Sequence, residues 1–225
     1  MTEMDFKVSK RNSTLRGQVE DKIRAAIREG HFVPGQRLVE RELCELLDVS
    51  RTSVREALRH LEAEGLINVV PHKGPTVAVM DKQEAQQLYE LRALLEGYAG
   101  EQFALTGSEE LKTKLGAALS EFEQIAASGT SGELLEAKAG FYQLLLEGCG
   151  NVFVGQTLES LYNRIALLRM TSMSQPGRLA HSLQELRGIV AAIQSGDGVA
   201  AGNACRLHIQ NAAKAALSGM PSQAA

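Results

Sequence analysis

The sequence has no tryptophan, only three cysteines, and no apolar run long enough to cross a membrane. A membrane-spanning helix needs about 20 predominantly apolar residues, so no span is predicted. The first ten residues are polar and lack the apolar core of a signal peptide. Cys44, Cys149 and Cys205 are odd in number and far apart, which indicates reduced thiols rather than a disulfide framework. These absences predict a cytoplasmic protein.

Motifs for catalysis are also missing. The chain contains no nucleophile elbow, phosphate-binding loop or dinucleotide fingerprint, so an enzyme is the weaker alternative. The net charge of −3 is unevenly distributed: residues 1–80 hold 13 Lys/Arg and 12 Asp/Glu, whereas residues 81–225 hold 11 and 15. This asymmetry favours a nucleic-acid-binding N-terminal part and a larger C-terminal part with another task.

Residues 50–65 carry the strongest local signal. Ser50 is a plausible N-cap and Gly65 a natural helix stop. Apolar residues recur at i, i+4 and i+7 on one face, and arginines recur every four residues on another. A shorter helix over residues 40–47 precedes this stretch, which makes the pair typical of a helix-turn-helix that reads DNA. The two faces consist of Val54, Leu58 and Leu61, and of Arg51, Arg55 and Arg59.

The flanking residues complete a winged helix-turn-helix. An apolar stripe predicts a helix from Ser13 to Glu29. β-Branched runs at residues 66–70 and 76–80 predict a hairpin with a basic tip at residues 71–75. We therefore predict a DNA-binding domain over residues 10–80, with flexible tails at 1–9 and 219–225.

Residues 81–218 show helical periodicity and no strand signal. Asp81 and Glu84 have the spacing of a capping box, which marks the domain boundary without a long linker. About six amphipathic helices follow. The first is predicted to bury a stripe of Leu88, Leu91, Leu95 and Tyr98, and the fourth is capped by Asn151 and striped from Val154 to Leu168. The predicted fold is mostly α: a winged helix-turn-helix followed by an antiparallel helical bundle for effector binding and dimerisation.

These motifs resemble a known family. The Pro-Gly-x-Arg-Leu run at 34–38, the Glu-Arg-Glu-Leu run at 40–43 and the run at 50–66 resemble the GntR transcription regulators. Glu90-Leu91-Arg92 with Glu96, and Gly150-Asn151, resemble the FadR-type ligand-binding domain. The resemblance covers residues 14–217. It implies a homodimer on a palindromic double-stranded operator, and a bundle that senses a small organic acid.

The resemblance also implies DNA-contacting positions. Arginine near the start of a recognition helix can bond guanine O6 and N7 together, while hydroxyls and wing residues suit phosphates. The matching positions are Arg37, Arg41, Ser50, Arg51, Thr52, Ser53, Arg55, His72, Lys73 and Gly74.

The bundle departs from the family at its metal site. Many members bind a divalent metal through an Asp and three His, and the corresponding positions here are Lys138, Tyr142, Leu186 and His208. One imidazole gives too little affinity, so neither a metal nor any other cofactor is predicted. His208 alone is compatible with a hydrogen-bonded core residue. An anionic metabolite could instead be held by charge-assisted hydrogen bonds. The candidate effector-binding residues are Arg92, Lys138, Tyr142, Arg164, Arg169 and His208.

Three functions follow from these patterns. The leading hypothesis is a DNA-binding transcription regulator, a repressor whose operator affinity responds to a small organic-acid effector. The second is a dimeric DNA-binding protein whose bundle senses nothing. The third is an enzyme.

Overall fold

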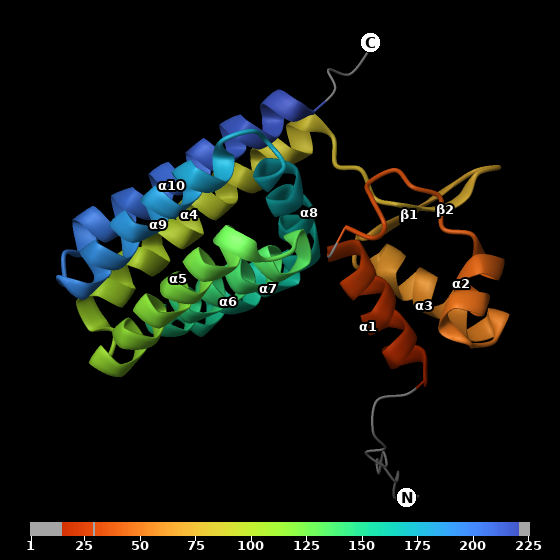
Figure 1. Ribbon diagram of the computed structural model, residues 1–225, viewed down its shortest axis with the longest axis horizontal. Helices are drawn as coiled ribbons and strands as arrows, with labels where there is room; N and C mark the ends of the chain where they lie inside the picture. The colour runs from red at the N-terminus through yellow and green to blue at the C-terminus, as the bar shows by residue number, and fades with distance from the viewer. Residues whose placement is uncertain (1–14, 29, 221–225) are drawn as a thin grey trace, which may run out of the picture. The chain divides into compact units, whose positions relative to one another are not determined.

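The computed structural model describes residues 15–28 and 30–220, so the predicted N-terminal tail 1–9 lies outside the described residues. These residues form helices and one two-stranded sheet, which confirms the predicted mostly α fold (Figure 1). They divide into two compact units. The first contains residues 15–27 and 35–78, and the second contains residues 28, 30–34 and 79–220. None of the described helices is both long and apolar enough to span a bilayer.

The first unit is a winged helix-turn-helix. The predicted apolar face of the recognition helix is buried, with Val54 and Leu61 fully enclosed and Leu58 at 4% exposure. The elements are α1 (Leu15–Arg28), α2 (Glu40–Leu47), α3 (Arg51–Ala63), β1 (Ile67–Val70) and β2 (Gly74–Val77).

The wing differs from its prediction in one respect. Strand β2 begins at Gly74 and ends at Val77, because Gly74 and Pro75 pair with Val70 and Val69 instead of lying in the turn. The turn is thus restricted to residues 71–73. The segment before α2 also pairs with β2: Leu38 donates its N–H to the Pro75 carbonyl at 2.8 Å. A proline in such a strand can still accept a bond even though it cannot donate one.

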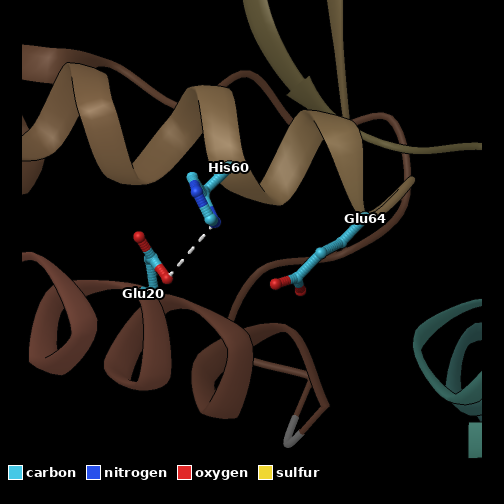
Figure 2. A group of neighbouring side chains, drawn as sticks. All are labelled: Glu20, His60 and Glu64. Carbon is cyan, nitrogen blue, oxygen red and sulfur yellow. Dashed lines mark ion pairs between the residues drawn. The ribbon is translucent and has the colours of Figure 1, made fainter. Parts of the chain in front are cut away.

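A polar cluster connects α1 with α3. Glu20 and His60 face each other across the two helices, with 3.8 Å between a carboxylate oxygen and Nδ1 (Figure 2). Glu64, at the end of α3, completes a group with metal-ligand chemistry. However, the Arg24 guanidinium donates to both Glu64 oxygens, at 2.9 and 3.0 Å. Because Arg24 already supplies the cation for this carboxylate, we interpret the group as an ion-paired clamp between helices.

The second unit is a helical bundle with seven described helices rather than six. The predicted fourth helix is broken at Leu161, whose N–H bonds to the Leu158 carbonyl three residues back, at 3.2 Å. Gly219 ends α10, and residues 221–225 of the predicted C-terminal tail lie outside the described chain. The helices are α4 (Lys82–Thr106), α5 (Glu109–Ser128), α6 (Ser131–Cys149), α7 (Val152–Ser160), α8 (Tyr162–Met173), α9 (Arg178–Gln194) and α10 (Gly198–Gly219).

Helix α4 begins with the predicted capping box: Asp81 accepts from the Glu84 N–H at 2.7 Å, and Glu84 accepts from the Asp81 N–H at 3.3 Å. Its buried face differs from the predicted leucine stripe. Leu91 and Tyr98 are 38% and 40% exposed, whereas Arg92 and Glu96 are almost fully buried. The predicted buried face of α4 was therefore wrong in part, because polar residues occupy some of the positions that face the bundle interior.

Helices α4 and α10 run side by side along the bundle (Figure 1). Glycines make this close approach possible. A Cβ atom added to Gly100 would lie 2.5 Å from Cys205 Sγ and 3.1 Å from the Ala201 carbonyl oxygen. The tight packing brings the polar face of α4 close to α10.

Candidate functional site

The start of α3 is held by its own hydroxyls. Ser50 is the N-cap, and its Oγ accepts from the Ser53 N–H at 3.2 Å and lies 3.0 Å from Ser53 Oγ. Thr52 is exposed at the same tip. Ser50 and Ser53 therefore shape the helix start, which points backbone N–H groups and the positive end of the helix dipole outward.

Exposed arginines lie along α2 and α3. Arg51 is exposed, and Arg41 is exposed with its Nε 4.0 Å from Glu45. Arg55 donates its Nε–H to both carboxylate oxygens of Glu40, at 2.9 and 2.8 Å. This contact uses only Nε, so the two terminal amino groups can still form a bidentate contact with guanine.

The wing tip is also exposed and basic. His72 and Lys73 are exposed, and the Lys73 N–H closes the turn on the Val70 carbonyl at 3.1 Å. Gly74 has a φ of +83°, which explains why glycine stands at this position. Arg37 is exposed and forms a bridge with Thr76 of β2. The first unit thus places the predicted DNA-contacting residues on α2, at the start of α3, at the wing tip and in the segment that bridges to β2.

The second unit encloses an unusual set of charged side chains. They come from α4, α6, α8 and α9, and the exposed fraction of every basic member is 8% or less. The basic members are Arg92, Lys138, Arg169 and Arg178, and the carboxylates among them are Glu96 and Glu185.

Two of these cations surround Tyr142. Arg92 donates its Nε–H to Glu96 at 2.7 Å, and its guanidinium carbon lies 5.7 Å from the Tyr142 ring centroid. The Arg169 guanidinium lies 4.1 Å over the same ring. Both distances suit a cation–π contact. Burial raises the pKa of Tyr142, so its phenol stays protonated.

Lys138 has a different environment. Its Nζ donates to Ser182 Oγ at 2.9 Å and contacts Met173 Sδ at 3.3 Å. Within the described residues no carboxylate forms an ion pair with it. Burial, followed by the positive charges of Arg178, Arg169 and Arg92, lowers the pKa of Lys138 well below its usual value, although Glu185 opposes this shift. Protonating Lys138 is costly unless an anion approaches.

Glu185 is the centre of a hydrogen-bond network between α9 and α10. It accepts from Arg178 Nη2 at 2.7 Å, from Asn211 Nδ2 at 2.8 Å and from His208 Nδ1 at 2.5 Å. Although burial favours its neutral form, these bonds lower the pKa of Glu185 to about 2. Burial and the charge of Lys138 outweigh the contact with Glu185 and lower the pKa of His208 to about 3. Glu185 is therefore ionised at neutral pH, and the His208 imidazole is neutral.

The structure brings five of the six candidate effector-binding residues into this interior: Arg92, Lys138, Tyr142, Arg169 and His208. Arg164, the sixth candidate, is exposed and does not lie in this interior. Arg169 lies five positions further along the helix, which places the two side chains about 140° apart around the helix axis. Sequence reasoning missed Arg178 and Glu185. The turn at Pro176-Gly177 gave no sign of a buried arginine, and Glu185 meets His208 only through the packing of α9 on α10.

The donor set does not suit a divalent metal. At the four positions where the family resemblance implies ligands, Leu186 is fully buried apolar core and Lys138 offers a competing positive charge. Glu185 already accepts three hydrogen bonds. His208 is thus the one conventional ligand among these four positions.

Comparisons with known proteins agree with this architecture. Residues 15–77 match the model for bacterial regulatory proteins of the gntR family, and residues 87–211 match the FCD domain. The Nta operon transcriptional regulator of Aminobacter aminovorans is 33% identical over 151 residues, which cover 67% of this chain and 71% of that protein. A probable D-xylose utilization operon transcriptional repressor of Paenarthrobacter nicotinovorans is 27% identical over 198 residues, covering 88% and 86%.

A solved structure shares the fold. The putative transcriptional regulator GntR from Rhodococcus sp. RHA1 superposes with a TM-score of 0.79 at 24% identity, covering 92% of this chain and 99% of that one. The recognition helix and wing supply DNA-binding chemistry, and the two matched models account for both units. The chain therefore belongs to the GntR family of transcription regulators, with an FCD domain as its C-terminal unit, and is not an enzyme.

Proposed function

We propose that this regulator is a repressor whose operator affinity is controlled by a small anionic metabolite, bound in the interior of the FCD domain without a metal. The observation that carries the proposal is Lys138. This residue is 3% exposed, and its amine contacts a hydroxyl and a thioether in a region made positive by three arginines. A buried amine in such surroundings is stabilised in its charged form only when an anion joins it. The related protein from Paenarthrobacter nicotinovorans is a probable operon repressor, which supports this direction of control.

Burial also explains how binding would act on the rest of the molecule. The groups proposed to hold the effector come from five helices and are almost fully enclosed. An effector can reach them only if these helices separate, and it then holds them in a new arrangement through its charge. A ligand that prefers one arrangement shifts the population toward it. Helix packing in the bundle would thereby differ between free and bound protein.

We further propose that the chain acts as a homodimer on a palindromic operator. Helices α4 and α10, which pack together, expose large apolar side chains to solvent. Exposed apolar side chains on two neighbouring helices are a feature of subunit interfaces. The most exposed members are Leu94 at 68%, Leu105 at 60%, Val199 at 70% and Leu207 at 54%. Sedimentation of Leu94→Glu as a monomer, with the wild type as a dimer, would support this interface.

A thermal-shift screen with small carboxylates and phosphates tests the sensing function. An anion that binds the folded state raises the unfolding midpoint by mass action. We expect the wild type to respond and Lys138→Met to lose the response. Arg164→Gln, on the exposed face of α8, is the matched control and should respond like the wild type. The same anion should weaken binding to an operator selected from random-sequence DNA.

Two results would contradict the proposal. If no anion shifts the midpoint while the chain still selects a DNA sequence, the bundle only dimerises, as in the alternative without sensing. If purified protein retains about one equivalent of a divalent metal after dialysis, and Lys138→Met retains it as well, the metal-free part is wrong.

A further inference from the structure

The clamp between α1 and α3 holds three metal-ligating side chains outside the helical bundle. His60 of α3 and Glu64 at its C-terminal cap lie four positions apart, so both extend from the same side of the helix. Glu20 of α1 points toward them from the facing helix (Figure 2). One ligand atom from each residue lies within 4.8 Å of the other two.

These separations are close to those of a zinc site. With bonds of about 2.1 Å, a tetrahedral zinc ion holds its ligand atoms roughly 3.4 Å apart. Glu20 Oε2 and His60 Nδ1 are 3.8 Å apart, which is too long for a hydrogen bond and slightly wider than the zinc spacing. The side chains of His60 and Glu64 are 58% and 31% exposed, so small rotations can close the remaining gap. An imidazole and two carboxylates are also ligands that zinc accepts.

The burial of Glu20 independently favours a cation at this place. Glu20 is 8% exposed, and its Oε1 is buried without a hydrogen-bond partner in the described residues. Arg16 Nε lies 3.1 Å from this oxygen but is not aligned to donate to it. The other oxygen, Oε2, faces His60. A buried carboxylate with so little compensation is unfavourable, and a bound cation would remove the penalty.

Arg24 leaves room for such an ion. It donates to both oxygens of Glu64, but a carboxylate oxygen can accept two bonds, so Glu64 can face Arg24 and an ion together. The ion pairs of the clamp join three carboxylates to two guanidinium groups, which leaves one negative charge in excess. The carboxylates belong to Glu20, Asp21 and Glu64, and the guanidinium groups to Arg16 and Arg24.

We infer that the clamp is a zinc-binding site, with Glu20, His60 and Glu64 as protein ligands and water as the fourth. The ion ties α1 to the recognition helix, whose first turns carry the DNA-contacting arginines. Because two guanidinium groups lie beside the ion, it is held less tightly than in a structural zinc site and is lost on dialysis. The site belongs to the first unit and does not depend on the sensing function proposed for the bundle.

Calorimetric titration of the full-length protein with zinc chloride tests the inference. Wild type, first freed of metal by a chelator, should bind one zinc ion per chain. His60→Gln should bind zinc at least about tenfold more weakly, since even the loss of an outer-shell partner costs that much. Because His60 is exposed, this variant should fold normally, and circular dichroism checks that it does. His181→Gln, which removes an exposed imidazole from α9, is the matched control and should bind zinc like the wild type.

Cobalt(II) provides a second measurement, because its visible absorption reports on its ligands. The absorption bands should appear in the wild type and be lost in both His60→Gln and Glu20→Gln. Unchanged zinc affinity in His60→Gln would overturn the inference. If zinc binding survives in that variant but is lost in His208→Phe, the ion lies in the bundle, and the metal-free part of the proposed function is wrong as well. No zinc binding by the wild type would overturn the inference and leave the proposed anion sensing intact.

Discussion

Replacing Lys138 by methionine tests the electrostatics of the bundle interior. Lysine is protonated in the unfolded chain up to a pKa of about 10.4. In the folded protein, burial and the three neighbouring guanidinium groups lower its pKa, so folding releases a proton over the interval between the two values. The unfolded state binds more protons there, and stability therefore rises with pH. The slope is about 1.4 kcal/mol per pH unit where the release is complete.

Methionine has a similar length and no charge, so Lys138→Met should lose this slope. We expect the difference in unfolding free energy between wild type and variant to change in favour of the wild type by up to about 2.7 kcal/mol from pH 7 to pH 9. The loss of the bond to Ser182 adds a constant that does not depend on pH. The pH slope is therefore the decisive quantity rather than the stability at one pH.

Urea unfolding followed by circular dichroism at several pH values measures the slope. Protein concentration must be fixed, since the stability of an oligomer depends on it. Lys214→Met, at an exposed position of α10, is the control and should keep the wild-type slope. Parallel pH profiles for wild type and Lys138→Met would refute the argument that this amine is held among positive charges.

The remaining predictions concern DNA contacts and helix packing. Arg55→Ala should weaken the binding free energy by about 1–3 kcal/mol on a selected operator and by much less on random DNA. Arg37→Ala should weaken binding to both DNAs equally and reduce the salt dependence of binding. Binding titrations at several salt concentrations would show both effects. Glu40→Gln should lower the preference for the selected operator over random DNA, because it weakens the charge-assisted bond that orients Arg55; an unchanged ratio would show that this contact does not orient it. Gly100→Ala should destabilise the protein by about 1–3 kcal/mol, because the added methyl group overpacks the contact between α4 and α10. Gly140→Ala, at an open helical position, should stabilise it by about 0.5–1 kcal/mol. Equal unfolding midpoints for the two variants would contradict the close approach of α4 and α10.

Local signals predicted the first unit and the start of the second well. Ser50 and Asp81 cap their helices with their own side chains, and both contacts join residues three positions apart. Such interactions depend on backbone geometry that neighbouring residues fix together. The same holds for the apolar face of α3, whose period of 3.6 residues survives any arrangement of the rest of the chain. The start of β2 was harder to predict from the sequence. Gly74 has the character of a turn residue, and only its pairing with Val70 places it in the strand.

Only the tertiary structure determined the interior of the bundle. The sequence supplied Lys138, Tyr142 and His208 as candidates, but it did not show that Glu185, 23 residues before His208, fixes the proton on that ring. It also treated Arg164 and Arg169 alike, although one is exposed and the other buried. Periodicity identifies helices, whereas the charge state and tautomer of a buried group depend on neighbours from other helices. The packing of α9 against α10 places Glu185 beside Nδ1 of His208, and the packing of four helices surrounds Lys138 with positive charge.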